Sequence, residues 1–333
     1  METIQKKRIE FIDLAKGVCI FLVVMGHCGA LVEIPGMSVV RMPLYFILSG
    51  LFFKTYGGFW NFTLKKTNKI LIPFLFFYLL GCVAYYVISF IAPTLLVTEA
   101  RGIWDLFDNR QFFNGPIWFL LCLFWCNLIF ATISINVKSE IVRIIIIAVL
   151  GTIGYQLGQH DVFVPLFLDV AMTSLPFFCF GYYLKQTQLL YPNRFDKYNP
   201  LIFLLFYIPA VLVSYYFDFR LSFHYNAVVN PLAACFVAVM SVLAILFLCK
   251  MIGRVPIISY AGRYSIVILC VHHFINRPAL VVLRRLLGVD SDMLPWCVFG
   301  VTIVLSIAFI PICVRFVPWF VAQKDLIKER NDK

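Results

Sequence analysis

The sequence predicts an all-α integral membrane protein with about ten transmembrane helices and both termini in the cytoplasm. Hydrophobic residues make up 62% of the 333 residues, charged residues make up only 14%, and the mean hydropathy is +0.90. Soluble globular domains carry about 45–50% apolar and about 25% charged residues, so this composition excludes them. The apolar residues also form long runs, and Lys and Arg gather in alternate connections between these runs.

Each apolar run that approaches the length of a bilayer crossing, about 20 residues, is expected to be one helix. The fifth run is the weakest, because Gly151, Gly154 and Gly158 interrupt it. The connections are short, so a single domain is expected over 1–333, with a core at 8–316 and a basic cytoplasmic tail at 317–333. The expected helices are residues 11–31, 38–53, 70–92, 116–135, 143–158, 163–184, 200–217, 227–249, 264–283 and 294–314.

Lys and Arg are divided unequally between the two sets of connections, and positively charged connections stay in the cytoplasm. If the N-terminus lies in the cytoplasm, most of the Lys and Arg residues also lie on the cytoplasmic side. The net charge of +11 then reflects topology and attraction to anionic membrane lipids, and no nucleic-acid partner is expected. The outer side receives only Arg41, Arg101, Arg110, Arg220, Arg277, Arg284 and Arg285.

The first expected helix carries three ionisable residues, Asp13, Lys16 and His27. Such residues are costly inside a membrane and are tolerated mainly where they face a cavity or a partner. Lys16 and His27 are eleven positions apart, which at about 100° per residue places them on one face, roughly 16 Å apart along the axis. Asp13 falls within about 60° of the same line. This face therefore presents a cation near one membrane surface and an imidazole deeper in the bundle.

The eleven cysteines and the remaining motifs exclude several other kinds of site. The cysteines are scattered singly, and no CxxC pair suggests a zinc or redox centre. No phosphate-binding loop or dinucleotide fingerprint is present. We therefore expect no metal site and no tightly bound cofactor.

The first helix resembles the opening helix of membrane acyltransferase family 3. The resemblance is carried by Arg8-Ile-Glu-Phe-Ile-Asp13-Leu-Ala-Lys16-Gly17, followed by Val23-Val24-Met25-Gly26-His27. The family has Arg-x10-His here, and Lys16-x10-His27 occupies the same register. Lysine keeps the charge but lacks the planar fork with which arginine grips a phosphate.

Further segments are similar to that family in the same order along the chain. They are 42–50 (MPLYFILSG), 69–74 (KILIPF), 115–120 (GPIWFL), 176–182 (PFFCFGY) and 260–265 (YAGRYS) with His272. The resemblance implies transfer of an acyl group, usually acetyl, from a cytoplasmic donor such as acetyl-CoA. It implies that the acceptor is a hydroxyl of an extracytoplasmic or lipid-linked glycan, in the cytoplasmic membrane of a bacterium.

The residues themselves fit this chemistry. Clustered cations attract the phosphates of CoA, and a neutral imidazole suits removal of a hydroxyl proton during acyl transfer. We assign catalytic roles to His27, as base or transient acyl carrier, and to Lys16 at the donor end. Substrate-binding roles are expected for Asp13, Lys66, Lys69, Arg263, Arg41 and His272.

Structural roles remain open for the same residues. His27 could instead hydrogen-bond a neighbouring helix, Lys16 could snorkel to the interface, and Asp13 could be its ion-pair partner or a helix cap. Arg41 could bind the acceptor or lipid headgroups, and Asp169 could orient an imidazole. Ser49 and Gly50 are expected to allow close helix packing.

Two other functions also remain open. A glycan flippase or secondary transporter also combines many helices with buried charges, although no pair of interrupted helices in matching halves is evident. A catalytically inactive scaffold would share the fold and bind no donor.

Overall fold

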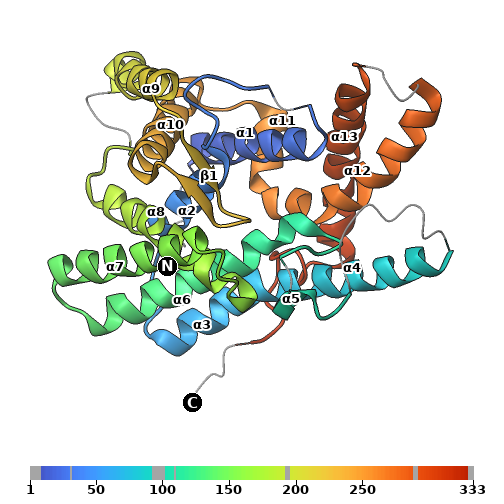
Figure 1. Cartoon of the computed structure of the whole chain (residues 1–333), viewed down its shortest axis with the longest axis horizontal. Helices are drawn as coiled ribbons and strands as arrows, with labels where there is room; N and C mark the ends of the chain where they lie inside the picture. Colours follow the sequence, from blue (N-terminus) through green and yellow to red (C-terminus); the bar gives the residue numbers. More distant parts are fainter. Residues whose placement is uncertain are drawn as a thin grey trace, which may run out of the picture.

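The computed structural model describes residues 9–30, 32–91, 102–108, 110–191, 196–287 and 292–328. It is built almost entirely from helices, as Figure 1 shows, and it confirms the all-α polytopic class. The sequence-based assignments at Arg8 and Arg101, and the tail from residue 329, lie outside these residues.

The first half of the described chain runs from α1 to α7, and the second half from α8 to α13. The first half comprises α1 (Glu10–His27), α2 (Arg41–Leu51), α3 (Phe59–Lys66), η1 (Thr67–Leu71), α4 (Ile72–Ile91), α5 (Asp105–Asp108), η3 (Gly115–Ile117), α6 (Trp118–Asn136) and α7 (Glu140–Gln159). The second comprises η4 (Pro165–Phe167), α8 (Leu168–Gln186), η5 (Asp196–Tyr198), α9 (Asn199–Tyr216), β1 (Arg220–Ser222), β2 (Ala227–Val229), α10 (Pro231–Ile252), α11 (Pro256–Arg263), α12 (Ser265–Leu287) and α13 (Leu294–Phe316).

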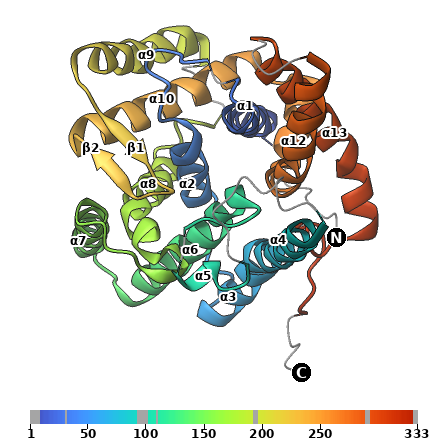
Figure 2. The same cartoon turned by 45° about the vertical axis from the view of Figure 1, so that its right-hand side comes forward.

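Eight helical segments in the described residues are long and apolar enough to cross a membrane. The first two expected helices differ from these eight. α1 has 18 residues but carries Glu10, Asp13 and Lys16, and α2 has only 11 residues. At 1.5 Å per residue α2 is about 16 Å long, roughly half of a bilayer core. It extends part of the way across, inside the shell of longer helices (Figure 2).

The third expected helix begins earlier than the sequence suggested. α3, η1 and α4 form one continuous segment, Phe59–Ile91, of 33 residues. Its centre, Thr67–Leu71, is a π-helical turn, and such turns occur frequently at functional sites. Lys65, Lys66 and Lys69, which were expected in a connection, therefore lie in a helix.

Two close helix crossings position the short helices. A Cβ atom on Gly50 would meet the backbone oxygen of Phe178, and one on Gly181 would meet that of Ile47, so α2 and α8 touch through their backbones. This confirms the packing role expected for Gly50. In the same way Gly262 of α11 lies against the Asp13 carbonyl of α1.

Replacing Gly181 by alanine is expected to destabilise the bundle, because the added Cβ would overlap the Ile47 carbonyl. Overpacking of this kind costs about 1–3 kcal/mol. The measurement is the thermal unfolding midpoint of the purified protein in detergent. Gly300→Ala is the matched control, since no atom lies within 4 Å of its added Cβ. Equal midpoints for the two variants would contradict the backbone contact between α2 and α8.

Candidate active site

The last residue of α1, His27, lies beside two histidines of α12. The ring centroids of His27 and His272 are 5.3 Å apart, and those of His27 and His273 are 6.2 Å apart. The His272 and His273 rings are themselves 6.3 Å apart. The structure therefore brings together two of the residues predicted from the sequence, His27 and His272, although their proximity was not itself predicted. It also adds His273, to which no role had been given.

The three imidazoles differ in their access to solvent. His272 is fully buried and His273 is 6% exposed, whereas His27, as a whole residue at the end of α1, is exposed. A group that takes a proton from a substrate hydroxyl, or carries its acyl group, must be reachable. Among the three, His27 alone meets this requirement.

Hydrogen bonds fix the protonated nitrogen of His272. Its Nδ1 lies 2.8 Å from the Ile268 carbonyl, and a carbonyl can only accept, so Nδ1 carries a proton. In the neutral imidazole the Nε2 lone pair is then free to accept, and this buried nitrogen has no partner among the described residues. His272 therefore offers an unused acceptor beside His27.

Polar residues of α12 and α2 surround this pair. Asn276 Nδ2 donates to the His27 carbonyl at 3.2 Å, and Arg277 Nε donates to His273 Nε2 at 3.3 Å. The Arg41 guanidinium lies against Gly26, one residue before His27. Arg41 and Arg277 are also close enough to His27 to interact with it electrostatically. Together they supply positive charge beside His27.

A cavity of about 370 Å³ lies beside the middle of α1, where Lys16 and Ile20 line it. Its lining combines apolar side chains with four lysines, Lys16, Lys65, Lys66 and Lys69. They come from α1 and from the α3–η1 segment, and they form a positively charged mouth on an apolar interior. A cavity of this size and character can bind a polyanionic molecule that has an apolar or amide-rich arm.

Five sequence-predicted site residues lie outside this lining, within the part of the chain described: Asp13, His27, Arg41, Arg263 and His272. Arg263 is exposed at the end of α11, with its guanidinium over the Tyr264 ring. Asp13 is 7% exposed, and its carbonyl packs against Gly262. Lys16, Lys66 and Lys69 do line the cavity, as does Lys65. Whether any of these residues binds substrate stays a prediction.

The cavity stops short of the histidines. Its deepest residues on α1 and α12 are Ile20 and Leu269. His27 is seven residues beyond Ile20, about 10 Å at 1.5 Å per residue, and buried Val24 lies between them. A molecule anchored at the lysines must part these side chains to reach His27.

The hypothesis that Asp169 orients an imidazole is wrong. The carboxylate is fully buried and pairs with Arg110, whose Nη2 lies 2.7 Å from Oδ2. Asn226 Nδ2 donates to the same oxygen at 2.9 Å. Pairing of this kind joins α8 to the segment before α6 and to the β1–β2 hairpin.

His224 lies on that hairpin and was not predicted from the sequence as a site residue. Its Nε2 bonds the Arg110 carbonyl at 2.7 Å, and its ring stacks on Trp118 and Phe167. Burial lowers the pKa of His224, which favours the neutral imidazole.

Asn276 and Arg277 of α12 were also not predicted from the sequence as site residues. Asn276 is four residues from His272 and Arg277 is four residues from His273 on one helix, and this spacing was the available signal. In the described residues no group of three or more His, Cys, Asp or Glu side chains could hold a metal ion.

Comparison with known proteins agrees with this arrangement. The family model described as an acyltransferase domain, that of acyltransferase family 3, matches residues 9–315, nearly the whole chain. No curated protein and no solved structure matches the chain.

Proposed function

The chain belongs to membrane acyltransferase family 3, and from this premise we propose that it moves an acetyl group from acetyl-CoA to a glycan hydroxyl. That it is a multi-pass membrane acyltransferase follows from the family and from the eight helices able to span a membrane. The donor, the acetyl group and an extracytoplasmic or lipid-linked glycan as acceptor are the proposed parts. The location of the protein in the cytoplasmic membrane of a bacterium is also part of the proposal.

One observation carries the proposal: a single helix, α1, links a lysine-lined cavity to an exposed histidine. Lys16 lines the cavity near the start of α1, and His27 ends the helix beside His272. Phosphates of CoA would pair with the lysines. The acyl-bearing arm would pass along α1 toward His27, once the side chains around Val24 move apart.

At the other end His27 would act on the acceptor. As a base it would take the hydroxyl proton while the oxygen attacks the acyl carbonyl, and CoA would leave as the thiol after receiving a proton. As a nucleophile it would attack the acyl carbonyl and displace CoA, which takes the imidazole proton and leaves as the thiol; the acyl group would then pass from His27 to the hydroxyl, whose proton returns to the imidazole. In either route the Arg41 and Arg277 guanidinium groups would stabilise the negative oxygen of the tetrahedral intermediate.

The proposal is tested by incubating membranes that contain the protein with acetyl-CoA labelled in the acetyl group. We expect label to enter the glycan fraction and to be released by mild base, as an ester is. Mass spectrometry of surface glycans from cells with and without the protein identifies the modified sugar. Membranes containing His27→Ala protein serve as the control. A transporter or flippase would leave the label on CoA, and this result would contradict the proposal.

A further inference from the structure

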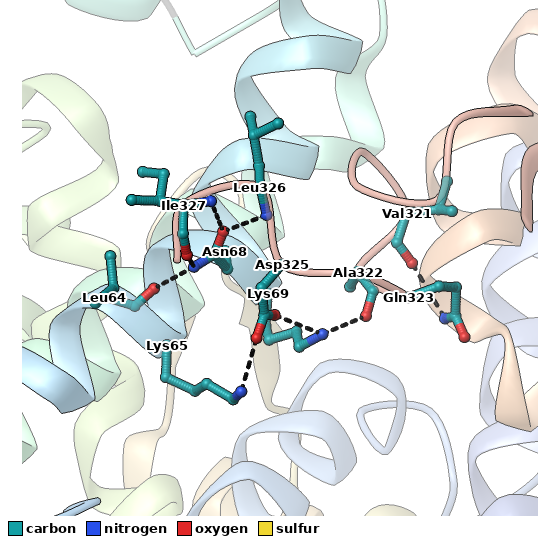
Figure 3. A network of polar contacts seen from close by, with 10 residues as sticks. All are labelled: Leu64, Lys65, Asn68, Lys69, Val321, Ala322, Gln323, Asp325, Leu326 and Ile327. Atoms are coloured by element: carbon teal, nitrogen blue, oxygen red, sulfur yellow. Dashed lines mark hydrogen bonds and ion pairs between the residues drawn. The ribbon is translucent and has the colours of Figure 1, made fainter. Parts of the chain in front are cut away.

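The chain after α13 turns back onto the bundle at the mouth of the lysine-lined cavity. Residues 317–328, here called the C-terminal segment, follow the end of α13 and reach η1 (Figure 3). Val321 is fully buried, and the Phe320 ring stacks on Phe76 of α4 with centroids 4.1 Å apart. The segment is therefore packed onto the bundle through apolar side chains.

Asn68 of the π-helical turn holds the far end of the segment in one register. This side chain is buried, and its Oδ1 accepts from the backbone N–H groups of Leu326 and Ile327 at 2.8 and 2.9 Å. Its Nδ2 donates to the carbonyls of Ile327 and Leu64. Every donor and acceptor of the amide is used, so the position of the preceding residue, Asp325, is well determined.

Asp325 bridges two of the cavity lysines. Its Oδ2 lies 2.8 Å from Lys65 Nζ and its Oδ1 lies 2.9 Å from Lys69 Nζ, as Figure 3 shows. Lys69 also donates to the Ala322 carbonyl at 2.9 Å. Two oxygens of one anion thus engage two ammonium groups, as a phosphate does between paired cations.

The ion pairs of Asp325 with Lys65 and Lys69 can be replaced by pairs with another anion. The side chains of Lys65, Lys69 and Asp325 are about one-third exposed, and ion pairs at such sites are weak. Hydrogen bonds from Lys65 and Lys69 lower the pKa of Asp325, so this carboxylate keeps its charge at neutral pH. No Asp or Glu lines the cavity itself in the described residues. A fixed negative charge therefore stands at the mouth of an otherwise cationic cavity.

We propose that Lys65 and Lys69 form an anion subsite for a phosphate group of the donor, and that Asp325 occupies this subsite until the donor displaces it. The inference rests on the proposed function, because it takes a phosphate-bearing donor as the ligand. The backbone of the C-terminal segment stays anchored by Asn68, Phe320 and Val321, and only the carboxylate moves. The C-terminal segment thereby raises the donor concentration that is needed to fill the binding site.

The test is binding of a non-reactive acetyl-CoA analogue to the purified full chain at low ionic strength. Asp325→Asn keeps the size of the side chain and removes the competing charge. We expect it to bind the analogue about 3- to 10-fold more tightly, the scale of two partly exposed ion pairs. The gain should shrink as salt is raised, because the competition is electrostatic.

Glu10→Gln is the matched control. Glu10 is also an exposed carboxylate at the start of α1, where it pairs with Arg254, and it does not line the cavity. Its loss should leave the affinity for the analogue unchanged. If Asp325→Asn does not fold, Asp325→Ala provides the same comparison.

The outcomes separate the two proposals. Unchanged or weaker binding by the Asp325 variants, while the wild type binds the analogue, would overturn the subsite and its internal competitor and leave the proposed function standing. A wild-type protein that binds no CoA analogue would overturn both.

Discussion

Replacing His27 by alanine is expected to lower acyl transfer by at least about 100-fold, the usual scale for loss of a positioned general base. His27 is the exposed member of a three-histidine cluster, so no other imidazole of the cluster is placed to take over its contact with substrate. The measurement is the rate at which label passes from acetyl-CoA to the glycan in membranes of matched protein content.

The His27 variant should otherwise resemble the wild type. His27 does not line the lysine-rich cavity, so binding of a non-reactive CoA analogue should be preserved. The hydrogen bond from Asn276 goes to the His27 backbone carbonyl and survives the substitution. Transfer at a near wild-type rate would contradict the catalytic assignment, and loss of donor binding would show that the variant is misfolded.

The general architecture could be predicted from the sequence because helix formation in a membrane depends on local chemistry. Backbone polar groups must be satisfied within each apolar run, so the run itself specifies the helix. The apolar run also predicted correctly that Lys16 and His27 belong to one helix, although α1 begins at Glu10 and ends at His27, four residues before the expected end. Such predictions need no knowledge of the neighbouring helices.

The arrangement around the site could not be predicted in the same way. Asp169 and Arg110 are 59 residues apart in sequence, and Lys65 and Asp325 are 260 apart. Such pairs depend on how the helices pack, and no local pattern encodes them. The tail shows the same limit, because its basic composition predicted a cytoplasmic location but not the packing of residues 317–328 onto the bundle through Phe320 and Val321.

The sequence also did not reveal which side chains of α12 approach His27, or where α2 begins and ends. His272 and His273 both approach His27, although adjacent residues differ by about 100° around a helix, because His27 lies between the two directions. The length of α2 was overestimated because its apolar run extends over 38–53, beyond both ends of the helix, which is Arg41–Leu51. A hydropathy pattern does not reveal where backbone hydrogen bonding stops.

Lys16 provides the sharpest separation between binding and chemistry along α1. Its side chain lines the cavity, and its backbone carbonyl accepts a hydrogen bond from the Tyr45 hydroxyl at 3.1 Å. That bond is independent of the side chain, so substitutions at this position should leave α1 in place. Lys16→Ala is expected to weaken binding of a non-reactive CoA analogue by about 10- to 100-fold, because hydrogen bonds to charged groups contribute about 1.5–3 kcal/mol.

Lys16→Arg should bind the analogue as well as the wild type or better, since a guanidinium adds bidentate contacts to a phosphate. Lys324→Ala is the control, because Lys324 is exposed and lies outside the cavity lining. This variant should bind the CoA analogue as tightly as the wild type. If Lys16→Ala binds the analogue as tightly as the wild type, the residue only supports the helix. The phosphates of the donor must then be held by Lys65, Lys66 and Lys69 on the α3–η1 segment, which is where Asp325 already places a negative charge.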